Sequence, residues 1–194
     1  GVATGRNGIV VDAGLRTSNR KIYAVGDVAG LGQYTHLAGF HAGIVLRSAL
    51  FRLPARADRT AIPGVVFTDP EFAHVGLRDY EARGQKTPIN ILRWPFAEND
   101  RAQAERDTRG LIKVITSKKG HILGASLVGR HAGEVIQPWI LAIAKRLKIA
   151  DMASLVVPYP TLGEVGKRAA GSYFTPKLFN PKTRKLVRFL ARLG

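Results

Sequence analysis

The 194-residue chain contains no cysteine, and this absence excludes several kinds of chemistry. Without cysteine the chain cannot form a structural disulfide, a thiolate metal site or a cysteine nucleophile. It also has no apolar run of the roughly 18–20 residues that a membrane-spanning helix needs, because the best one, Trp139 to Ala144, stops at Lys145. Its first residues lack the basic stretch followed by an apolar stretch that marks a signal peptide. We therefore expect a cytoplasmic protein.

Acidic residues are scarce. The chain has 14 Asp and Glu against 30 Lys and Arg, which gives a formal net charge of +16. Eight basic residues and no acidic one lie between Val165 and the end, so half of the net charge belongs to the last thirty residues. Such a basic tail attracts nucleic acid, anionic lipid and acidic protein without choosing among them. The hydrophobic share of 45% and the charged share of 23% are those of an ordinary folded protein.

The N-terminal part of the chain has an α/β pattern. We expect a short strand at Gly8 to Asp12 and a second at Lys21 to Gly26, whose nearly continuous apolar run is typical of a strand in a parallel sheet. Apolar residues at helical spacing predict a helix over Thr35 to Phe51, with Thr35 as its N-cap. The polar, proline-bounded segment Leu53 to Pro63 predicts a domain boundary.

The rest of the chain predicts an α+β domain in which an antiparallel sheet carries packed helices. A charged connection separates two groups of elements, and a kink or a helix start is expected near Pro138. The expected strands are 65–67 and 89–94, followed by a hairpin of 111–116 and 121–128. The expected helices are 78–83, 132–145, 152–156 and 161–170, and the charged connection is 98–109.

The segment Thr17 to Asp27, TSNRKIYAVGD, predicts a ligand site. Gly26 lets the backbone turn and approach a ligand closely. Asp27 would stand at the carboxyl end of a strand, where it can accept hydrogen bonds from ligand hydroxyls. The start of the following helix offers N–H groups and partial positive charge. The alternative is a generic strand–turn–helix in which Asp27 serves only as a helix cap.

This segment resembles the second FAD-binding segment of the pyridine nucleotide-disulfide oxidoreductases. The resemblance implies that Gly26 and Asp27 lie at the flavin's ribityl chain, and that Thr35, His36, Leu37 and Ala38 lie at its ring. Two further segments, Ala61 to Leu77 and Gly120 to Gln137, resemble the entry and the central hairpin of that family's C-terminal dimerisation domain. The implied organisation is the end of an FAD domain (1–56), a dimerisation domain (57–174) and a basic extension (175–194).

The segment Val156 to Ala170, VVPYPTLGEVGKRAA, resembles the closing motif of the family, in which a His and a Glu act as acid and base. The His position is Tyr159 here, while Glu164 is kept. A phenol with a pKa near 10 is a poor base at neutral pH, so the usual thiol–disulfide route is in doubt. The mercuric reductase branch also has Tyr there, although the mercury-receiving cysteine pair of that branch is absent. Alternatively, Tyr159 is an interface aromatic, and Glu164 forms a capping box with Thr161.

The resemblance also shows what this chain does not contain. It has neither the Cys-x4-Cys segment nor the first dinucleotide fingerprint of the family. We therefore expect a piece of a longer homodimeric flavoenzyme that uses FAD and NAD(P)H, and we expect the piece alone to bind no flavin and to be inactive. The alternative is a non-catalytic homodimerisation module with a basic tail.

The extension 175–194 has the pattern of a basic amphipathic helix. We favour packing on its own domain or on a partner subunit, ahead of peripheral contact with an anionic membrane. Nucleic acid is the least favoured partner, because no recognised DNA-binding motif accompanies the charge. The five histidines, at positions 36, 41, 74, 121 and 131, show no metal-ligand spacing with carboxylates and are expected in the core or on the surface.

Overall fold

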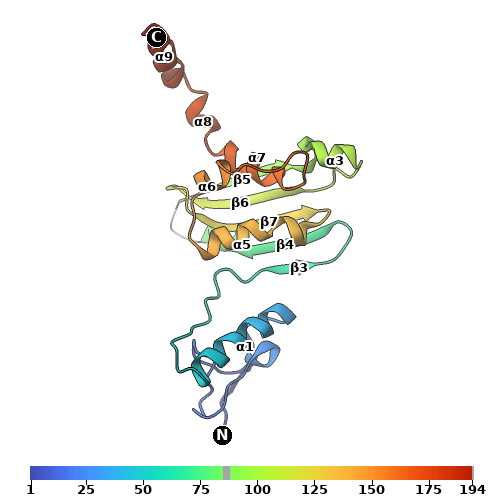
Figure 1. Ribbon diagram of the computed structural model, residues 1–194, viewed down its shortest axis with the longest axis vertical. Coiled ribbons are helices and arrows are strands. Elements are labelled where there is room, and N and C mark those ends of the chain that lie inside the picture. The colour runs from blue at the N-terminus through green and yellow to red at the C-terminus, as the bar shows by residue number, and fades with distance from the viewer. Residues whose placement is uncertain (85–87, 194) are drawn as a thin grey trace. The chain divides into compact units, whose positions relative to one another are not determined.

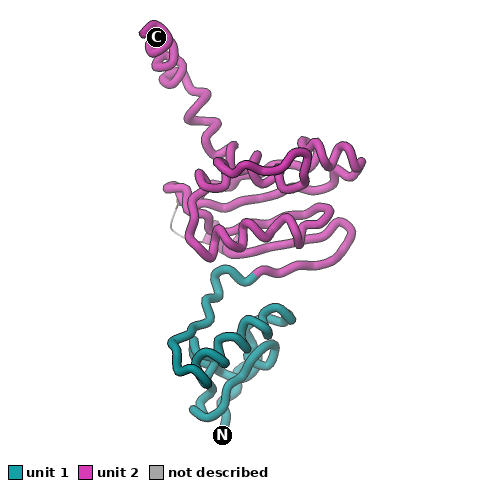
Figure 2. The backbone as a smooth tube through the Cα atoms, viewed as in Figure 1, with its two compact units in different colours: residues 1–62 teal, residues 63–194 magenta. Residues whose placement is uncertain are grey.

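A computed structural model of the protein describes residues 1–84 and 88–193. The chain divides into two compact units, which we call unit 1 (Gly1–Ile62) and unit 2 (Pro63–Gly194) (Figure 2). The three-part division at positions 56/57 and 174/175 stays a prediction.

Unit 1 contains a small antiparallel pair, β1 (Thr4–Gly5) with β2 (Gly8–Ile9), a 3-10 turn η1 (Gly26–Ala29) and the helix α1 (Thr35–Ala49). The helix buries Leu37, His41 and Ile44, which lie three or four residues apart and so share one face. The prediction that Thr35 is the N-cap is wrong. The helix begins at Thr35 itself, and the N-cap residue Tyr34 has extended backbone and makes no side-chain capping bond.

The predicted parallel strand at 21–26 is not formed in unit 1. Tyr23 instead makes an isolated antiparallel bridge with Arg16. A tight turn sends the chain back on itself, because the Ile22 N–H donates to the Asn19 carbonyl at 2.9 Å and the Thr17 N–H donates to the Ile22 carbonyl at 3.0 Å. The apolar run therefore pairs with the segment just before it, and the expected strand at 8–12 is reduced to the two residues of β2.

Unit 2 is built on a five-stranded sheet in the order β3-β4-β7-β6-β5, and every neighbouring pair is antiparallel (Figure 1). This arrangement confirms the predicted α+β class. The predicted hairpin is β6 paired with β7, closed by a turn in which the Gly120 N–H donates to the Ser117 carbonyl at 2.9 Å. The strands are β3 (Gly64–Val66), β4 (Glu71–Gly76), β5 (Ile89–Pro95), β6 (Leu111–Ser117) and β7 (Ile122–Gly129).

Helices form a layer on this sheet (Figure 1). The helix α5 (Gln137–Ala144) packs on β4 and β7, while α7 (Glu164–Ser172) packs on β5 and β6. The two helices meet where Gly166 lies against the buried Trp139, so close that a Cβ on Gly166 would be 3.1 Å from the indole nitrogen. The predicted helix over 132–145 is broken near Pro138, as expected, into α4 (Ala132–Val135) and α5.

The remaining elements of unit 2 are short. The helix predicted at 152–156 lies slightly earlier, and the one predicted from Thr161 begins only at Glu164. A helix and a 3-10 turn occupy part of the predicted charged connection. The short elements of unit 2 are α2 (Asp79–Gly84), η2 (Phe96–Glu98), α3 (Asp100–Ala104) and α6 (Ile149–Ala153).

The C-terminal tail consists of α8 (Thr175–Leu178) and α9 (Pro181–Leu190), and neither helix has a buried residue. The expected packing of this tail on its own domain is therefore not seen. Among the described helices, none combines the length and the apolar character required to cross a membrane.

Candidate functional site

The residues predicted to bind flavin lie together in unit 1. Gly26 has a φ of +66°, a left-handed conformation that favours glycine, and a Cβ there would meet the Cβ of Ala38 at 3.0 Å. The glycine therefore lets the turn η1 approach the first turn of α1 closely. Asp27, the next residue, is exposed, and its carboxylate makes no hydrogen bond or ion pair to the described part of the chain.

A buried histidine that the sequence did not single out holds this turn against the helix. The Gly26 N–H donates to Nδ1 of His41 at 3.1 Å. A neutral ring therefore carries its proton on Nε2, which is buried and has no hydrogen-bond partner in the described residues. Burial, with a smaller contribution from the charge of Arg59, lowers the pKa of His41. The ring thus stays neutral as an acceptor for the Gly26 amide.

The start of α1 carries the other predicted flavin contacts. Thr35 and His36 are exposed, Ala38 is half-buried, and Leu37 is buried in the unit 1 core. No side chain caps this end and the first turn holds no acidic residue, so its partial positive charge is not compensated. The rings of Tyr34 and His36 stack with centroids 4.9 Å apart.

The chemistry of this set fits a flavin. An exposed carboxylate without a protein partner can accept hydrogen bonds from the hydroxyls of a sugar-alcohol chain. The uncompensated helix start suits an electron-rich ring, and the exposed Val25 and Val28 beside Asp27 provide apolar surface. These are the donors, acceptors and apolar contacts that one side of a flavin site requires.

A second predicted site lies in unit 2, where the Tyr159 hydroxyl donates to Oδ2 of Asp100 at 2.9 Å. The ring is 68% exposed. This hydrogen bond, together with the charge of Asp100, raises the pKa of the Tyr159 phenol. Asp100 was not predicted as part of this site, because it lies 59 positions before Tyr159 in the sequence.

The acceptor is fixed by a helix cap. Asp100 is the first residue of α3, and the side chain of Asn99 accepts from the Ala102 N–H at 2.9 Å to cap that helix. The Asn99 amide also donates to the Thr161 carbonyl at 3.1 Å. One buried asparagine thus ties α3 to the loop that carries Tyr159.

Glu164, the other predicted catalytic residue, has no structural role as a cap. The helix α7 begins at Glu164 with Gly163 as its N-cap and no side chain caps it, so the capping box proposed for Thr161 and Glu164 is not formed. The Thr161 hydroxyl instead donates to the Pro158 carbonyl at 2.8 Å. The Glu164 carboxylate is half-buried and makes no hydrogen bond or ion pair with any described residue. It therefore remains available to a group from outside this chain.

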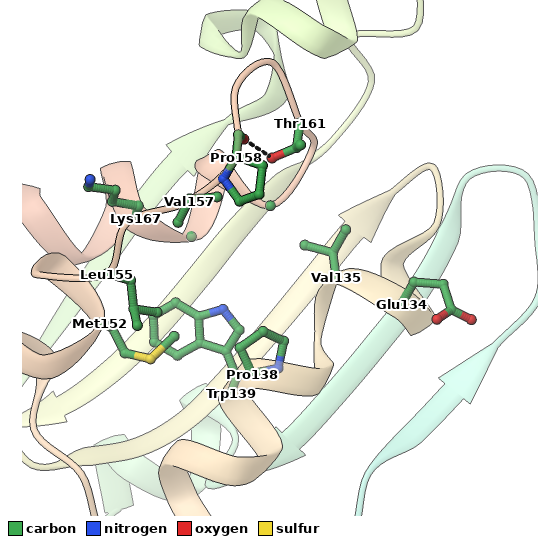
Figure 3. A pocket seen from close by; sticks show the side chains of 12 residues that line it. Glu134, Val135, Pro138, Trp139, Met152, Leu155, Val157, Pro158, Thr161 and Lys167 are labelled. Atoms are coloured by element: carbon green, nitrogen blue, oxygen red, sulfur yellow. Dashed lines mark hydrogen bonds between the residues drawn. The ribbon is translucent and has the colours of Figure 1, made fainter.

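An apolar cavity of about 320 Å³ lies beside the same loop, between α5, α6 and α7. Figure 3 shows Trp139, Met152 and Leu155 close together, with Pro158 and Thr161 joined by their hydrogen bond. Val156, next to this lining, is almost fully exposed. Exposed apolar surface next to an open cavity is typical of an interface with another chain.

A second buried histidine lies within the sheet of unit 2. His74 is in contact through Nδ1 with the Ser126 hydroxyl and through Nε2 with the Gly76 carbonyl, each at 2.9 Å. Burial is the main cause that lowers the pKa of His74. Both ring nitrogens are used within the sheet, so this histidine is structural.

The comparison with curated proteins gives relatives of two kinds. The chain is 38% identical over 168 residues to a dihydrolipoyl dehydrogenase of Geobacillus stearothermophilus, covering 86% of this chain and 36% of the relative. It is 34% identical over 166 residues to a mercuric reductase of Bacillus cereus, covering 84% of this chain and 26% of the relative. The chain thus spans about a quarter to a third of the length of these relatives.

Solved structures show the same fold. LpdA from Mycobacterium tuberculosis matches 89% of this chain and 38% of its own, with a TM-score of 0.83 and 27% identity. The HOCl-induced flavoprotein disulfide reductase RclA from Escherichia coli matches 88% of this chain and 40% of its own, with a TM-score of 0.79 and 29% identity.

Residues 62–170 match the dimerisation domain of the pyridine nucleotide-disulphide oxidoreductases. This range covers more than half of the chain and contains the whole five-stranded sheet with the helices α4 to α6 and most of α7. The chain therefore belongs to the pyridine nucleotide-disulphide oxidoreductase family and carries the dimerisation domain of that family.

Proposed function

We propose that this chain is the C-terminal portion of an FAD- and NAD(P)H-dependent disulfide oxidoreductase that works as a homodimer, similar to the mercuric reductase branch. The match of residues 62–170 to the dimerisation domain carries this proposal. The redox cysteines would come from elsewhere in the whole protein, since this chain has none. Thiols are kept reduced in the cytoplasm, which suits a reductase that delivers electrons to a cysteine pair, so the proposed location is the cytoplasm.

Unit 1 supplies part of the flavin site in this proposal. Asp27 would accept hydrogen bonds from the ribityl hydroxyls, and the start of α1 at Thr35 to Ala38 would face the ring. Bound FAD would pass reducing equivalents from the nicotinamide to the cysteine pair. Gly26 and His41 act indirectly, because their 3.1 Å hydrogen bond sets the turn from which Asp27 projects.

Unit 2 supplies Tyr159 and Glu164, which we place at the partner subunit's redox centre. The raised pKa keeps the Tyr159 phenol protonated at neutral pH, so it serves as a hydrogen-bond donor or orients the substrate and does not act as a base. Asp100 is a positioning residue, because it holds the phenol through the 2.9 Å bond. Glu164 is left as the carboxylate that can exchange a proton there.

The chain alone should be inactive and should bind no flavin. Unit 1 leaves many apolar side chains exposed, which is expected if other segments of the FAD domain normally cover them. These side chains include Val10, Phe40, Leu46, Leu50 and Phe51. A flavin held from one side only would lose most of the buried contacts that a cofactor site needs.

The test is flavin retention by the whole protein with Asp27→Asn. Losing hydrogen bonds to a charged acceptor should weaken flavin binding about 10- to 100-fold, as measured by absorbance of the purified protein and by FAD titration. Glu98→Gln, which removes one exposed negative charge from unit 2, should leave flavin retention unchanged. Undiminished flavin affinity of the Asp27→Asn protein would remove Asp27 from the site.

The second candidate is a non-catalytic homodimerisation module. The apolar cavity beside the Tyr159 loop favours it, because such a cavity suits a subunit interface and requires no cofactor. The encoding reading frame separates the two candidates, because an upstream Cys-x4-Cys segment with a Gly-x-Gly-x-x-Gly fingerprint belongs only to the oxidoreductase. Both candidates require a dimer, and a monomer at high micromolar concentration in light scattering would contradict both.

A further inference from the structure

The helix α9 presents apolar side chains that nothing in unit 2 covers. It contains no buried residue, and the apolar side chains on it and just after it are 53% to 69% exposed. Contiguous apolar exposure of this kind marks an interaction surface. The side chains are those of Leu186, Val187, Phe189, Leu190 and Leu193.

Most of the basic side chains of α9 lie on the side of the helix opposite to these apolar side chains. At about 100° per residue, Leu186, Phe189 and Leu190 share one side of α9, while Arg184, Lys185 and Arg188 share the other. Lys182, in the first turn, falls on the apolar side, and Arg192 and Leu193 lie just beyond the end of the helix. Residues 175–194 contain six basic residues and no acidic one. The tail therefore combines an apolar face with a purely cationic face.

The helix is already formed without a partner. Asn180 caps it by accepting from the Thr183 N–H at 2.9 Å, and Pro181 occupies its first turn, where proline is favoured. The Thr183 hydroxyl donates to the Lys177 carbonyl at 2.8 Å and so joins α9 to α8. The exposed Leu178 and Phe179 at this junction extend the apolar surface.

We propose that α9 is a peripheral membrane anchor that lies along the surface of an anionic lipid bilayer. Its apolar face would enter the boundary between headgroups and acyl chains, while its arginines and lysines would contact lipid phosphates. Such a bilayer matches both faces of the helix at once.

Nucleic acid and a second copy of the tail each match only one face. A nucleic acid would neutralise the cationic face but would leave the leucines and Phe189 exposed to water. A second copy of the tail would cover the leucines but would bring together two segments that each carry six basic residues and no acidic one.

The first test is cosedimentation of the full chain with vesicles. We expect binding to phosphatidylcholine vesicles that contain phosphatidylglycerol, weaker binding at high salt, and little binding to phosphatidylcholine alone. Arg188→Gln/Arg192→Gln should weaken partitioning about 25-fold, since each cation near an anionic surface strengthens binding about fivefold. The control Lys119→Gln/Lys145→Gln removes the same charge from exposed sites outside the tail and should change partitioning about twofold or less.

The apolar face is tested separately. Leu186→Ser/Leu190→Ser should weaken partitioning about 30-fold while all the charges are kept. The fluorescence emission of a Phe189→Trp variant should shift to shorter wavelength when anionic vesicles are added. The control Phe67→Trp, at an exposed position just after β3, should show no such shift. Circular dichroism shows whether each variant is folded.

Three results would overturn the proposal. One is equal binding to the two kinds of vesicle, and another is binding that survives deletion of residues 175–194. The third is a leucine variant that alters the dimer mass in light scattering or duplex-DNA binding but leaves vesicle partitioning unchanged. Because the test measures lipid binding alone, its failure would leave the proposed oxidoreductase function untouched.

Discussion

Unit 1 and unit 2 differ in how completely they bury their own apolar residues. The sheet and helices of unit 2 enclose a large core that includes Phe96, Ile112, Leu127 and Trp139. Unit 1 buries only a few large side chains, Leu15, Leu37 and Ile44 among them, and leaves much of its apolar surface exposed. A segment of about 60 residues is marginally stable even when it is compact. The comparison indicates that unit 2 encloses a substantial core of its own, whereas unit 1 buries little apolar surface for its size.

The largest expected effect is a loss of stability in unit 2, the unit with the larger core. Trp139→Ala removes a side chain that is 1% exposed at the contact between α5 and α7, so the free energy of unfolding should fall by about 3–5 kcal/mol. Leu141→Ala on the same helix, where the side chain is 57% exposed, is the control and should cost about 1 kcal/mol or less. Urea unfolding followed by circular dichroism measures both. Equal losses would mean that Trp139 is not central to the core.

A smaller effect comes from acid and distinguishes the two units. Burial lowers the pKa of His41 in unit 1 and of His74 in unit 2, so below about pH 6.5 the unfolded chain takes up protons that the folded chain resists. Stability should therefore fall as the pH drops from 7.5 to 5.5, by up to about 1.4 kcal/mol per pH unit for each histidine.

Tryptophan fluorescence can follow unit 2 alone, because Trp94 and Trp139 both belong to it. His74→Gln should flatten the pH dependence seen by this probe, and His41→Gln should not. Glu105 and Asp107 do not interfere, since ion pairing with Arg101 and Arg109 lowers their pKa values and moves their titration to still lower pH. If His41→Gln flattened the signal, the two units would be energetically coupled.

The smallest expected effect tests whether Glu164 stabilises unit 2 as a helix cap. With no capping box to lose, Glu164→Ala should change the free energy of unfolding by less than about 0.5 kcal/mol. Asn99→Ala, which removes the cap of α3, should cost about 1–2 kcal/mol in the same thermal or urea measurement. A loss of about 1 kcal/mol for Glu164→Ala would instead support a capping role for this side chain.

The sequence predicted the sheet better than it predicted unit 1, for identifiable reasons. The β6–β7 hairpin follows from alternation and a local turn at Ser117 to Gly120, which nearby residues determine. The strand β4 was missed, because its pairing with β7 depends on residues about fifty positions later. The run at 21–26 has the composition of a parallel strand, but a parallel strand needs neighbours that unit 1 does not contain.

The candidate site was predicted residue by residue but not in its supporting contacts. Asp27, Tyr159 and Glu164 follow from local motifs, and their roles stay predictions. His41 and Asp100 act through partners 15 and 59 positions away, a separation at which local sequence patterns carry no signal. The capping box is not formed because α7 begins at Glu164 with Gly163 as its N-cap, three residues later than the motif predicted.

The close packing at Gly166 restricts which residues can occupy this position during evolution. It stands two positions after Glu164 on α7, and the missing side chain at 166 is what allows α7 to lie directly on the indole of Trp139. A single added methyl group would require the indole or the helix to move by a few tenths of an ångström, and a shift of the helix would carry the Glu164 carboxylate with it. Drift at position 166 should therefore be constrained by the placement of Glu164 as well as by packing, and a larger residue there should be accompanied by a smaller one at 139.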